Sequence, residues 1–370
     1  MDRVLCGGAP GGSSPTAAGL HAAGWLLAAP RLPPARRSAC AHGLAGSRPQ
    51  RGDGQAHGVL AEGPAAVSGR WRIAAAQYDI RRPADWDGYV RRIGDWVTEA
   101  ADADASLLVF PEYGGLELAG LDEREALTAA DGFAVVHEHL AAFKALFHDL
   151  ARGHGLHILA PSVPVRARGG RYRNRAMLFG PHGRLGWQDK LRLTRFETSL
   201  DLLEPGEGLT RFATALGGLG IITCYDSEFP DVARALVRAG ADTLLAPSCT
   251  ESVTGFNRVR IGCRARALEN QCYTVQASLV GQAPWMPVID VNHGAAGVFG
   301  PPEPGLPGDG LLASGREDEP GWVYADLDTT VLAEIRRHGE VGLHEEWTCA
   351  EPGLPDVRQR GGRATPGGGG

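Results

Sequence analysis

Residues 71–348 alternate short apolar runs with longer segments in which apolar residues recur at helical spacing. The runs RIAAAQYDI (72–80) and SLLVFPE (106–112) predict buried strands, and a proline ends the second one abruptly. Between them, apolar residues recur every three or four positions from Trp86 to Val97, which predicts an amphipathic helix. Because alternating strands and helices cover each other's apolar faces, we expect a layered α/β domain.

The same pattern continues along the chain. We expect a second helix over roughly 134–153, where two glycines stop it, and a third strand that begins in LHILAPSVP. RAMLFGPHGRLGWQDK predicts a hairpin, because Pro-His-Gly is turn chemistry between two strand-like runs. Further strands are expected in GLGIITC, TLLAPS, YTVQASLVG and GWVYADLD, and further helices in PDVARALVRAG and NRVRIGCRARALENQC. The hairpins among alternating elements indicate a sheet of mixed strand direction.

Both ends of the chain differ from the middle in composition. Residues 1–70 and 349–370 are rich in Gly, Ala, Pro, Ser and Arg and poor in large apolar residues. Such segments cannot bury enough surface to offset their chain entropy, so we expect them to be disordered. The apolar run AAGWLLAAP is short and poorly flanked for a signal peptide, and a translation start near Val59 or Val67 is an alternative interpretation.

The overall composition narrows the class of protein. The chain has 370 residues and a formal net charge of −6 with mixed signs, so it offers no basic surface for nucleic acid or anionic membranes. It has no run of 18 or more apolar residues, and we expect no membrane span. Its seven cysteines form no CxxC pairs, so we expect neither a disulfide framework nor a metal site, no cofactor, and a reducing cytoplasmic location.

Three residues share one setting, since each closes an extended segment. Glu112 follows LLVFP, Lys190 ends the second arm of the predicted hairpin, and Cys224 follows GIIT. Taken singly, they are explained by a loop carboxylate, a surface charge and a buried structural cysteine. A cysteine protease is a weaker interpretation of Cys224, because its histidine base cannot be located from the sequence.

Together, however, the three segments resemble the nitrilase, or carbon–nitrogen hydrolase, superfamily. FPEYG is similar to its glutamate motif, DKLRLTRFE to its lysine motif and CYDSEFPD to its cysteine elbow, in the same order as in the family. RARALENQCY is similar to a helix typical of the family. The resemblance covers residues 71–348. It implies a four-layer α-β-β-α sandwich of two mixed sheets, assembled into a homodimer or larger homo-oligomer.

The resemblance also implies a chemistry for these residues. Amides and nitriles are poor electrophiles, so the enzyme must supply a strong nucleophile and a charged stabiliser. In this scheme Cys224 attacks the substrate carbonyl and forms a thioester, and Glu112 acts as general base. Lys190 and the backbone N–H of Tyr225 face the developing oxyanion. The expected partners are a small-molecule amide and water, and the products are an acid and ammonia or an amine.

Two further residues have roles implied by the resemblance. Glu197 matches a second family glutamate that positions the substrate amide and supports the lysine, although a solvated loop carboxylate is the alternative. Tyr113, next to the expected base, is either a pocket wall or a packing residue. Asp226, Glu228 and Asp231 could suggest metal ligands, but turn, cap and surface positions explain them more simply.

Departures from the family pattern bear on the substrate. Some relatives that hydrolyse acidic substrates carry arginines where this chain has Ser227 and Glu228. A glutamate facing the pocket would repel a carboxylate, so a neutral or cationic amide is expected. Nitrile cleavage is less favoured, because Tyr-Asp instead of Trp-Glu follows the cysteine. The Pro/Gly-rich segment 293–315 is expected to form a loop over the pocket entrance. An acyltransferase and a catalytically silent scaffold stay open as alternatives.

Overall fold

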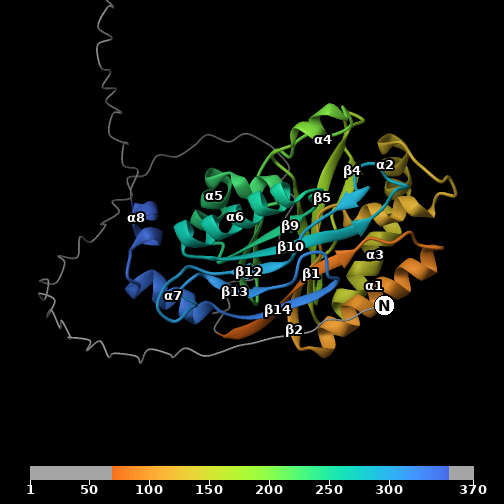
Figure 1. Cartoon of the computed structure of the whole chain (residues 1–370). Coiled ribbons are helices and arrows are strands. Elements are labelled where there is room, and N and C mark those ends of the chain that lie inside the picture. Colours follow the sequence, from red (N-terminus) through yellow and green to blue (C-terminus); the bar gives the residue numbers. More distant parts are fainter. Residues whose placement is uncertain (1–68, 350–370) are drawn as a thin grey trace, which may run out of the picture. The chain divides into compact units, whose positions relative to one another are not determined.

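The computed structural model describes residues 69–349, which form one α/β unit (Figure 1). The predicted extensions, residues 1–70 and 349–370, lie outside this part except for their innermost positions. Among residues 69–349, no helix has the length and apolar character needed to cross a membrane. The helices are α1 (Trp86–Asp102), η1 (Gly114–Leu121), α2 (Ala129–Glu138), α3 (Leu140–His154), α4 (Arg195–Ser199), η2 (Cys224–Glu228), α5 (Pro230–Arg238), α6 (Val253–Asn270), α7 (Thr329–His338) and α8 (Leu343–Cys349).

The strands occur where the apolar runs predict them, with several additional short ones. They are β1 (Arg70–Asp79), β2 (Ala105–Val109), β3 (His157–Leu159), β4 (Val163–Arg166), β5 (Tyr172–Gly180), β6 (Gly183–Asp189), β7 (Arg211–Thr214), β8 (Gly217–Ile221), β9 (Thr243–Ser248), β10 (Tyr273–Gln282), β11 (Val291–Asn292), β12 (Gly297–Phe299), β13 (Leu311–Ser314) and β14 (Gly321–Asp328). Parallel and antiparallel pairs both occur, so the strand direction is mixed as expected.

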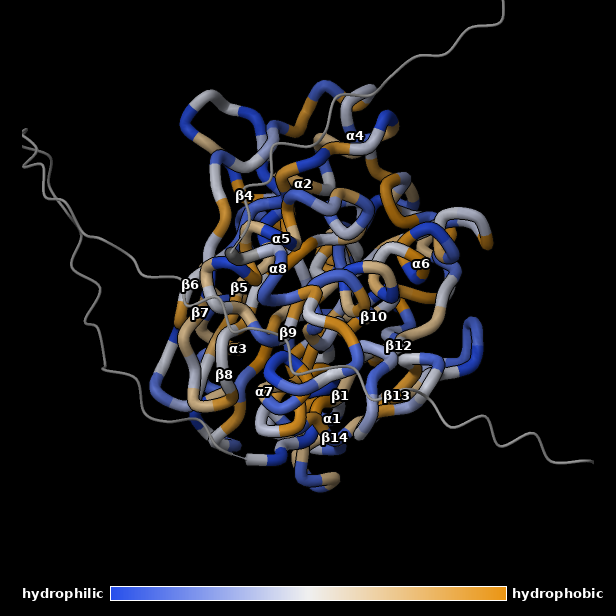
Figure 2. The backbone as a smooth tube through the Cα atoms, turned by 90° about the vertical axis from the view of Figure 1, so that its left-hand side faces the viewer, coloured by the Kyte–Doolittle hydropathy of each residue, from blue (hydrophilic) through white to orange (hydrophobic). Residues whose placement is uncertain are grey.

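Three clusters of buried apolar residues separate four layers. The central cluster combines inward-facing residues of β1 and β2, such as Ile73 and Leu107, with those of β8 and β9, such as Ile221 and Leu245. A second cluster packs α1, α2 and α3 on the outer face of the first half of the sheet, and a third packs α5 and α6 on the outer face of the other half. Figure 1 shows α5 and α6 on one side of the strands and α1 and α3 on the other. In Figure 2 hydrophobic residues are concentrated along the central strands. This is the expected α-β-β-α order.

The two halves of the sheet are joined at a seam between β1 and β10. Gln77, Tyr78 and Asp79 pair in parallel with Ser278, Leu279 and Val280, so hydrogen bonds connect the strands of the two halves into one network. The Gln77 side chain, which is 2% exposed, ties β1 at this seam to the residue before β12 and to the chain after β13. Its amide nitrogen donates to the Arg316 carbonyl oxygen at 2.7 Å, and its amide oxygen accepts from Ala296 N–H at 3.0 Å.

Parallel strands run through the seam in the order β2, β1, β10, β9 and β8. Their carboxyl ends therefore meet at one edge of the network, which is where ligands bind in open α/β sheets. Glu112 follows β2, Cys224 follows β8 and Cys249 follows β9. β6, the second arm of the predicted hairpin, also ends at this edge, immediately before Lys190.

The helix expected over roughly 134–153 is two helices. α2 starts earlier than predicted, at Ala129, because Thr128 and Asp131 form a capping box. α2 and α3 then meet at His139, which caps the end of one helix and the start of the next. Apolar spacing does not reveal this break, because the apolar stripes of both helices face the same cluster. Of the two glycines predicted to stop the helix, Gly153 lies inside α3, and Gly155 caps its end at His154 in the left-handed conformation (φ 68°).

A buried polar network fixes the segment that follows Glu112. Arg92 on α1 lies over the Tyr78 ring, with its guanidinium carbon 4.4 Å from the ring centroid. It also pairs with Glu117 Oε1 at 2.5 Å and Asp79 Oδ1 at 2.8 Å, and the Tyr78 hydroxyl donates to Glu117. Burial raises the pKa of Glu117 to about 7, although Arg92 opposes the shift. η1 is thereby attached to α1 and β1.

This network predicts a pH-dependent part of the stability. A folded carboxyl with a pKa of about 7 retains a proton that the unfolded chain releases near its ordinary value of 4.5. The contribution of Glu117 to the free energy of unfolding is therefore fully present below pH 4.5 and falls as the pH rises through 7. In urea denaturation at pH 5, 6, 7 and 8, Glu117→Gln should remove part of this decline, by up to ~1.4 kcal/mol per pH unit. Glu125→Gln, at an exposed position, is the matched control. Equal pH slopes in wild type and Glu117→Gln would contradict the assignment.

Candidate active site

Cys224 occupies a strained turn at the carboxyl end of β8. Its backbone is in the left-handed region, with φ 48°, which is costly for a residue with a Cβ and is typical of functional sites. The Ser227 hydroxyl donates to the Cys224 carbonyl oxygen at 2.6 Å and braces the turn. On the other side, Gly262 lets α6 approach closely, because a Cβ there would lie 2.9 Å from the Ser227 carbonyl oxygen. The turn therefore holds the thiol in one place.

Glu112 is buried, with 1% of its surface exposed, and both carboxylate oxygens are hydrogen-bonded. Oε1 accepts from Lys190 Nζ at 2.8 Å and from Asn174 Nδ2 at 2.8 Å, and Oε2 accepts from the Cys249 backbone N–H at 3.1 Å. Burial raises its pKa to about 7, with Lys190 opposing and Glu197 adding to the shift. A carboxyl in this range can both accept and return a proton near neutrality.

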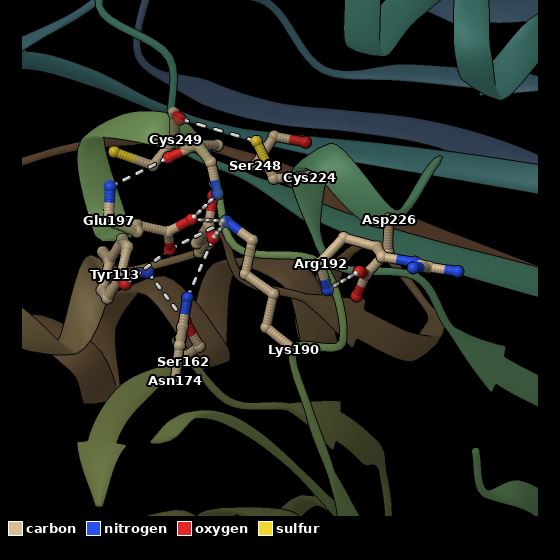
Figure 3. Close-up of polar contacts among 12 residues, drawn as sticks. Tyr113, Ser162, Asn174, Lys190, Arg192, Glu197, Cys224, Asp226, Ser248 and Cys249 are labelled. Atoms are coloured by element: carbon tan, nitrogen blue, oxygen red, sulfur yellow. Dashed lines mark hydrogen bonds and ion pairs between the residues drawn. The ribbon is translucent and has the colours of Figure 1, made fainter. Parts of the chain in front are cut away.

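Asn174 and Ser162 orient the glutamate, and the sequence analysis did not identify them. The Ser162 hydroxyl donates to Asn174 Oδ1 at 2.6 Å, which turns the amide nitrogen of Asn174 toward Glu112. Ser162 Oγ also accepts from the Tyr113 backbone N–H at 2.8 Å. Figure 3 shows these two side chains below the charged cluster. Neither residue belongs to the three quoted motifs, so no local signal marked them.

Lys190 lies between two carboxylates. Its Nζ donates to Glu112 Oε1 at 2.8 Å and to Glu197 at 2.9 Å (Oε1) and 2.7 Å (Oε2), and the side chain is 2% exposed (Figure 3). Burial alone would lower the pKa of Lys190, but Glu112 and Glu197 raise it well above its ordinary value. The ammonium group therefore stays charged across the physiological range of pH.

Glu197 is held in place from two other directions. It forms a capping box with Thr194 at the start of α4, accepting the Thr194 N–H at 2.8 Å. The Tyr113 hydroxyl donates to its Oε1 at 2.7 Å. Burial opposes ionisation of Glu197, but Lys190 and these donors outweigh it and lower its pKa. Tyr113 thus lines the pocket and also binds the second glutamate, so both alternatives for it hold.

The Cys224 thiol is neutral in the resting state. Burial raises its pKa well above the ordinary value, and the charge of Glu112 adds to the shift while Lys190 opposes it. Sγ donates to the Cys249 carbonyl oxygen at 3.6 Å (Figure 3). A thiol in such surroundings becomes a nucleophile only when a nearby base takes its proton. Glu112 is the carboxylate whose charge acts most strongly on this thiol.

Turn, cap and surface positions were expected for Asp226, Glu228 and Asp231, and Asp226 lies buried within the turn η2. It is 1% exposed, and its carboxylate accepts the backbone N–H of Leu191 at 3.2 Å and of Arg192 at 2.7 Å (Figure 3). Burial raises its pKa to about 6. Asp226 lies two residues after Cys224, and the two amides directly follow Lys190. It therefore ties the turn of the nucleophile to the chain that carries the lysine.

These groups open into one pocket of about 280 Å³. Glu112, Tyr113, Lys190, Glu197 and Cys224 all line it. Its volume is just below the roughly 300–1,000 Å³ of typical small-molecule sites. Tyr225 also lines the pocket, and its backbone N–H, at the start of η2, donates to no group within residues 69–349. The structure thus brings together every site residue predicted from the motifs.

Glu228 lines the pocket but is not a free charge. Arg258 on α6 donates to both of its carboxylate oxygens, at 2.8 to 3.0 Å. Its pairing with Arg258, 30 positions further along the chain, offsets the negative charge on which the expected repulsion of substrate carboxylates was based. The expected neutral or cationic amide stays a prediction. Among residues 69–349, no group of three or more His, Cys, Asp or Glu side chains is arranged to hold a metal ion.

The segment expected to form a loop over the pocket entrance lies elsewhere. Segment 293–315 contributes β12 and β13, which extend the sheet beside β10, and none of its residues lines the pocket. The wall comes instead from Pro287, Val288, Asp290 and Val291. The Pro/Gly-rich residues 300–310 do form a loop, between β12 and β13, but none of them lines the pocket. The pairing of β12 with β10 places the loop elsewhere, and it depends on contacts distant in sequence.

Comparison with known proteins adds the family context. A sequence model of the family described as carbon–nitrogen hydrolase matches residues 72–336. The chain is 32% identical over 271 residues to a protein named probable hydrolase YhcX from Bacillus subtilis, covering 73% of this chain and 52% of that protein. It thus spans about half the length of that relative. It is 30% identical over 224 residues to the deaminated glutathione amidase of Yersinia enterocolitica, covering 57% and 74% of the two chains.

Solved structures agree with this assignment. An amidase of Nesterenkonia sp. AN1, from the nitrilase superfamily, matches with a TM-score of 0.56 at 26% identity, covering 75% of this chain and 97% of that one. Saccharomyces cerevisiae Nit3, of the same superfamily, matches with a TM-score of 0.58 at 21% identity, covering 75% and 96%. With the family model spanning most of the chain, this protein belongs to the carbon–nitrogen hydrolase family of the nitrilase superfamily.

Proposed function

We propose that this protein hydrolyses a small linear amide through a thioester on Cys224. The observation that carries the proposal is the convergence of a buried base, a charged lysine and a thiol on one pocket, with Glu112 and Lys190 2.8 Å apart. Relatives named as amidases support an amide as substrate. In addition, one structure of a mutant of the Nesterenkonia amidase shows covalent addition of the acetamide moiety of fluoroacetamide at the active-site cysteine.

In the first half-reaction the amide carbonyl lies against Cys224. Glu112 takes the thiol proton as Sγ forms a bond to the carbonyl carbon, and the carbonyl oxygen becomes negatively charged. Lys190 Nζ and the Tyr225 N–H face this oxyanion, and one such donor typically contributes about 3 kcal/mol. Glu112 then returns the proton to the leaving nitrogen, the C–N bond breaks, and ammonia or an amine departs.

In the second half-reaction water attacks the thioester. Glu112 takes a proton from the water as its oxygen bonds to the carbonyl carbon, and the proton passes to the Cys224 sulfur as the C–S bond breaks. The products are a carboxylic acid and the free thiol. A pKa of about 7 suits Glu112 to both directions of transfer, since acid–base catalysis is most efficient near the working pH.

The proposal also covers the cellular compartment and the oligomeric state. Cys224, Cys249, Cys263 and Cys272 are all free thiols, which supports a reducing compartment such as the cytoplasm. Assembly into a homo-oligomer stays a prediction from the family resemblance.

The thioester mechanism predicts a clear pattern among variants. Ammonia release from a diverse panel of amides should be abolished in Cys224→Ala, and Glu112→Gln should lose about 10²–10⁴-fold in rate. Cys263→Ala, a buried cysteine on α6 outside the pocket lining, is the control. Intact mass after rapid quenching should show an acyl adduct on Cys224. Release that persists in Cys224→Ala would refute the mechanism, and product formed only with an added amine would favour acyl transfer instead.

The raised pKa of Glu112 predicts the acid limb of the pH profile. The base must be ionised to take the thiol proton, so kcat/KM should rise with pH and level off above about 7. Glu207→Gln, an exposed carboxylate, should leave the limb in place. A limb near pH 4.5, the ordinary value for a glutamate, would contradict this assignment of the base.

The link through Asp226 predicts a positioning effect. Asp226→Asn places an NH2 group against one of the two backbone amides and leaves a buried donor unpaired, which costs about 1–3 kcal/mol. Displacement of Lys190 should lower kcat and kcat/KM together by about tenfold or more, with KM unchanged. Asp95→Asn, on the exposed face of α1, is the matched control. A lower melting temperature with unchanged kcat would show a purely structural role.

A further inference from the structure

The charged side chains of the pocket are unequally paired. Two cations line it, and both already have partners: Lys190 pairs with Glu112 and Glu197, and Arg258 pairs with Glu228. The lining also contains two other carboxylates, Glu251 and Asp290. Neither forms an ion pair with any residue of the part described, 69–349. The pocket therefore offers a substrate free negative charge and no free positive charge.

Glu251 and Asp290 lie on one fixed wall. His293 N–H donates to the Thr250 carbonyl oxygen at 2.7 Å, and the Thr250 hydroxyl donates to the His293 carbonyl oxygen at 2.7 Å. The Cys249 thiol donates to Asn292 Oδ1 at 3.2 Å. These bonds hold the chain after β9 beside the chain that leads through β11. Glu251 and Asp290, one from each chain, are consequently presented to the same cavity.

The remaining contacts of the two carboxylates leave their oxygens available. Asp290 Oδ1 accepts the backbone N–H of Val291 at 2.9 Å, and its Oδ2 has no hydrogen bond within residues 69–349. Glu251 has no side-chain hydrogen bond within the same residues. Both side chains are exposed at the pocket, so their oxygens are accessible to a ligand. Phe196, Val288 and Val291 supply an apolar lining alongside them.

We propose, building on the proposed amide hydrolysis, that the preferred substrate carries a positive charge remote from its amide. The amide carbon lies at Cys224, an apolar linker contacts the Val288 and Val291 side of the pocket, and an ammonium or guanidinium group lies between Glu251 and Asp290. Complementary charge steers such a molecule into the pocket and fixes its register.

An anionic amide would bind less favourably in this pocket. To bind a substrate carboxylate, Arg258 would have to leave Glu228, with which it makes three contacts of 2.8 to 3.0 Å. The released Glu228 would then face the substrate, together with Glu251 and Asp290. Breaking a hydrogen-bonded pair and adding like charges both disfavour this mode.

The test compares three amides of matched length. 6-Aminohexanamide is cationic, heptanamide is its neutral counterpart and pimelic acid monoamide is the anionic one. We expect kcat/KM to fall in that order, with the cationic substrate at least about tenfold above the neutral one. Glu251→Gln and Asp290→Asn should each lower the ratio of cationic to neutral substrate about fivefold, as roughly 1 kcal/mol per exposed charge pair implies. High salt should lower it as well. Glu125→Gln, an exposed carboxylate away from the pocket, should leave the ratio unchanged.

A binding measurement separates this inference from the proposed reaction. Calorimetry with Cys224→Ala and unreacted 6-aminohexanamide should show binding that Glu251→Gln and Asp290→Asn weaken in the same background. Hydrolysis of all three amides at equal kcat/KM, or a preference for the anionic one, overturns the cationic preference but keeps the hydrolase. Binding of the cation without turnover of any amide supports the charge assignment and refutes the proposed reaction. Absence of binding to Cys224→Ala, or binding indifferent to both carboxylates, overturns the inference.

Discussion

The candidate site depends on one buried cation shared by two carboxylates. Lys190 lies within 2.9 Å of oxygens of both Glu112 and Glu197, and all three side chains are almost fully buried. A single positive charge cannot fully stabilise two negative ones in a medium of low polarity. Glu197 also receives the Thr194 N–H and the Tyr113 hydroxyl, so its ionised form is favoured.

Glu112 is then left as the group whose proton is easily exchanged, with a pKa of about 7. Both glutamates contact the same ammonium group, so the difference between their pKa values comes from their other surroundings. Removal of Lys190 would leave two buried carboxylates without a cation, which is strongly destabilising in proteins. Activity and stability of this region are therefore coupled through the same contacts.

Much of this arrangement could be predicted from the sequence. The strands that end at Glu112 and Cys224 are continuous apolar runs, and the motifs that follow them are local signals. The capping box that holds Glu197 is also local, since Thr194 lies three residues earlier. The partners missed by the sequence analysis are the distant ones: Asn174 lies 62 positions from Glu112, and Arg258 lies 30 from Glu228. A hydrogen bond between remote segments leaves no periodicity to detect.

The seam between β1 and β10 gives the site an unusual dependence on the fold. Glu112 follows β2 in one half of the sheet and Cys224 follows β8 in the other, so the separation of the proposed base and nucleophile spans the junction between β1 and β10. Under the proposed mechanism, a change that shifts β1 against β10 would alter proton transfer without touching a reacting group. The packing of the two halves thus sets the separation of the two groups. Substitutions far from the pocket would then change the reaction rate by changing that separation.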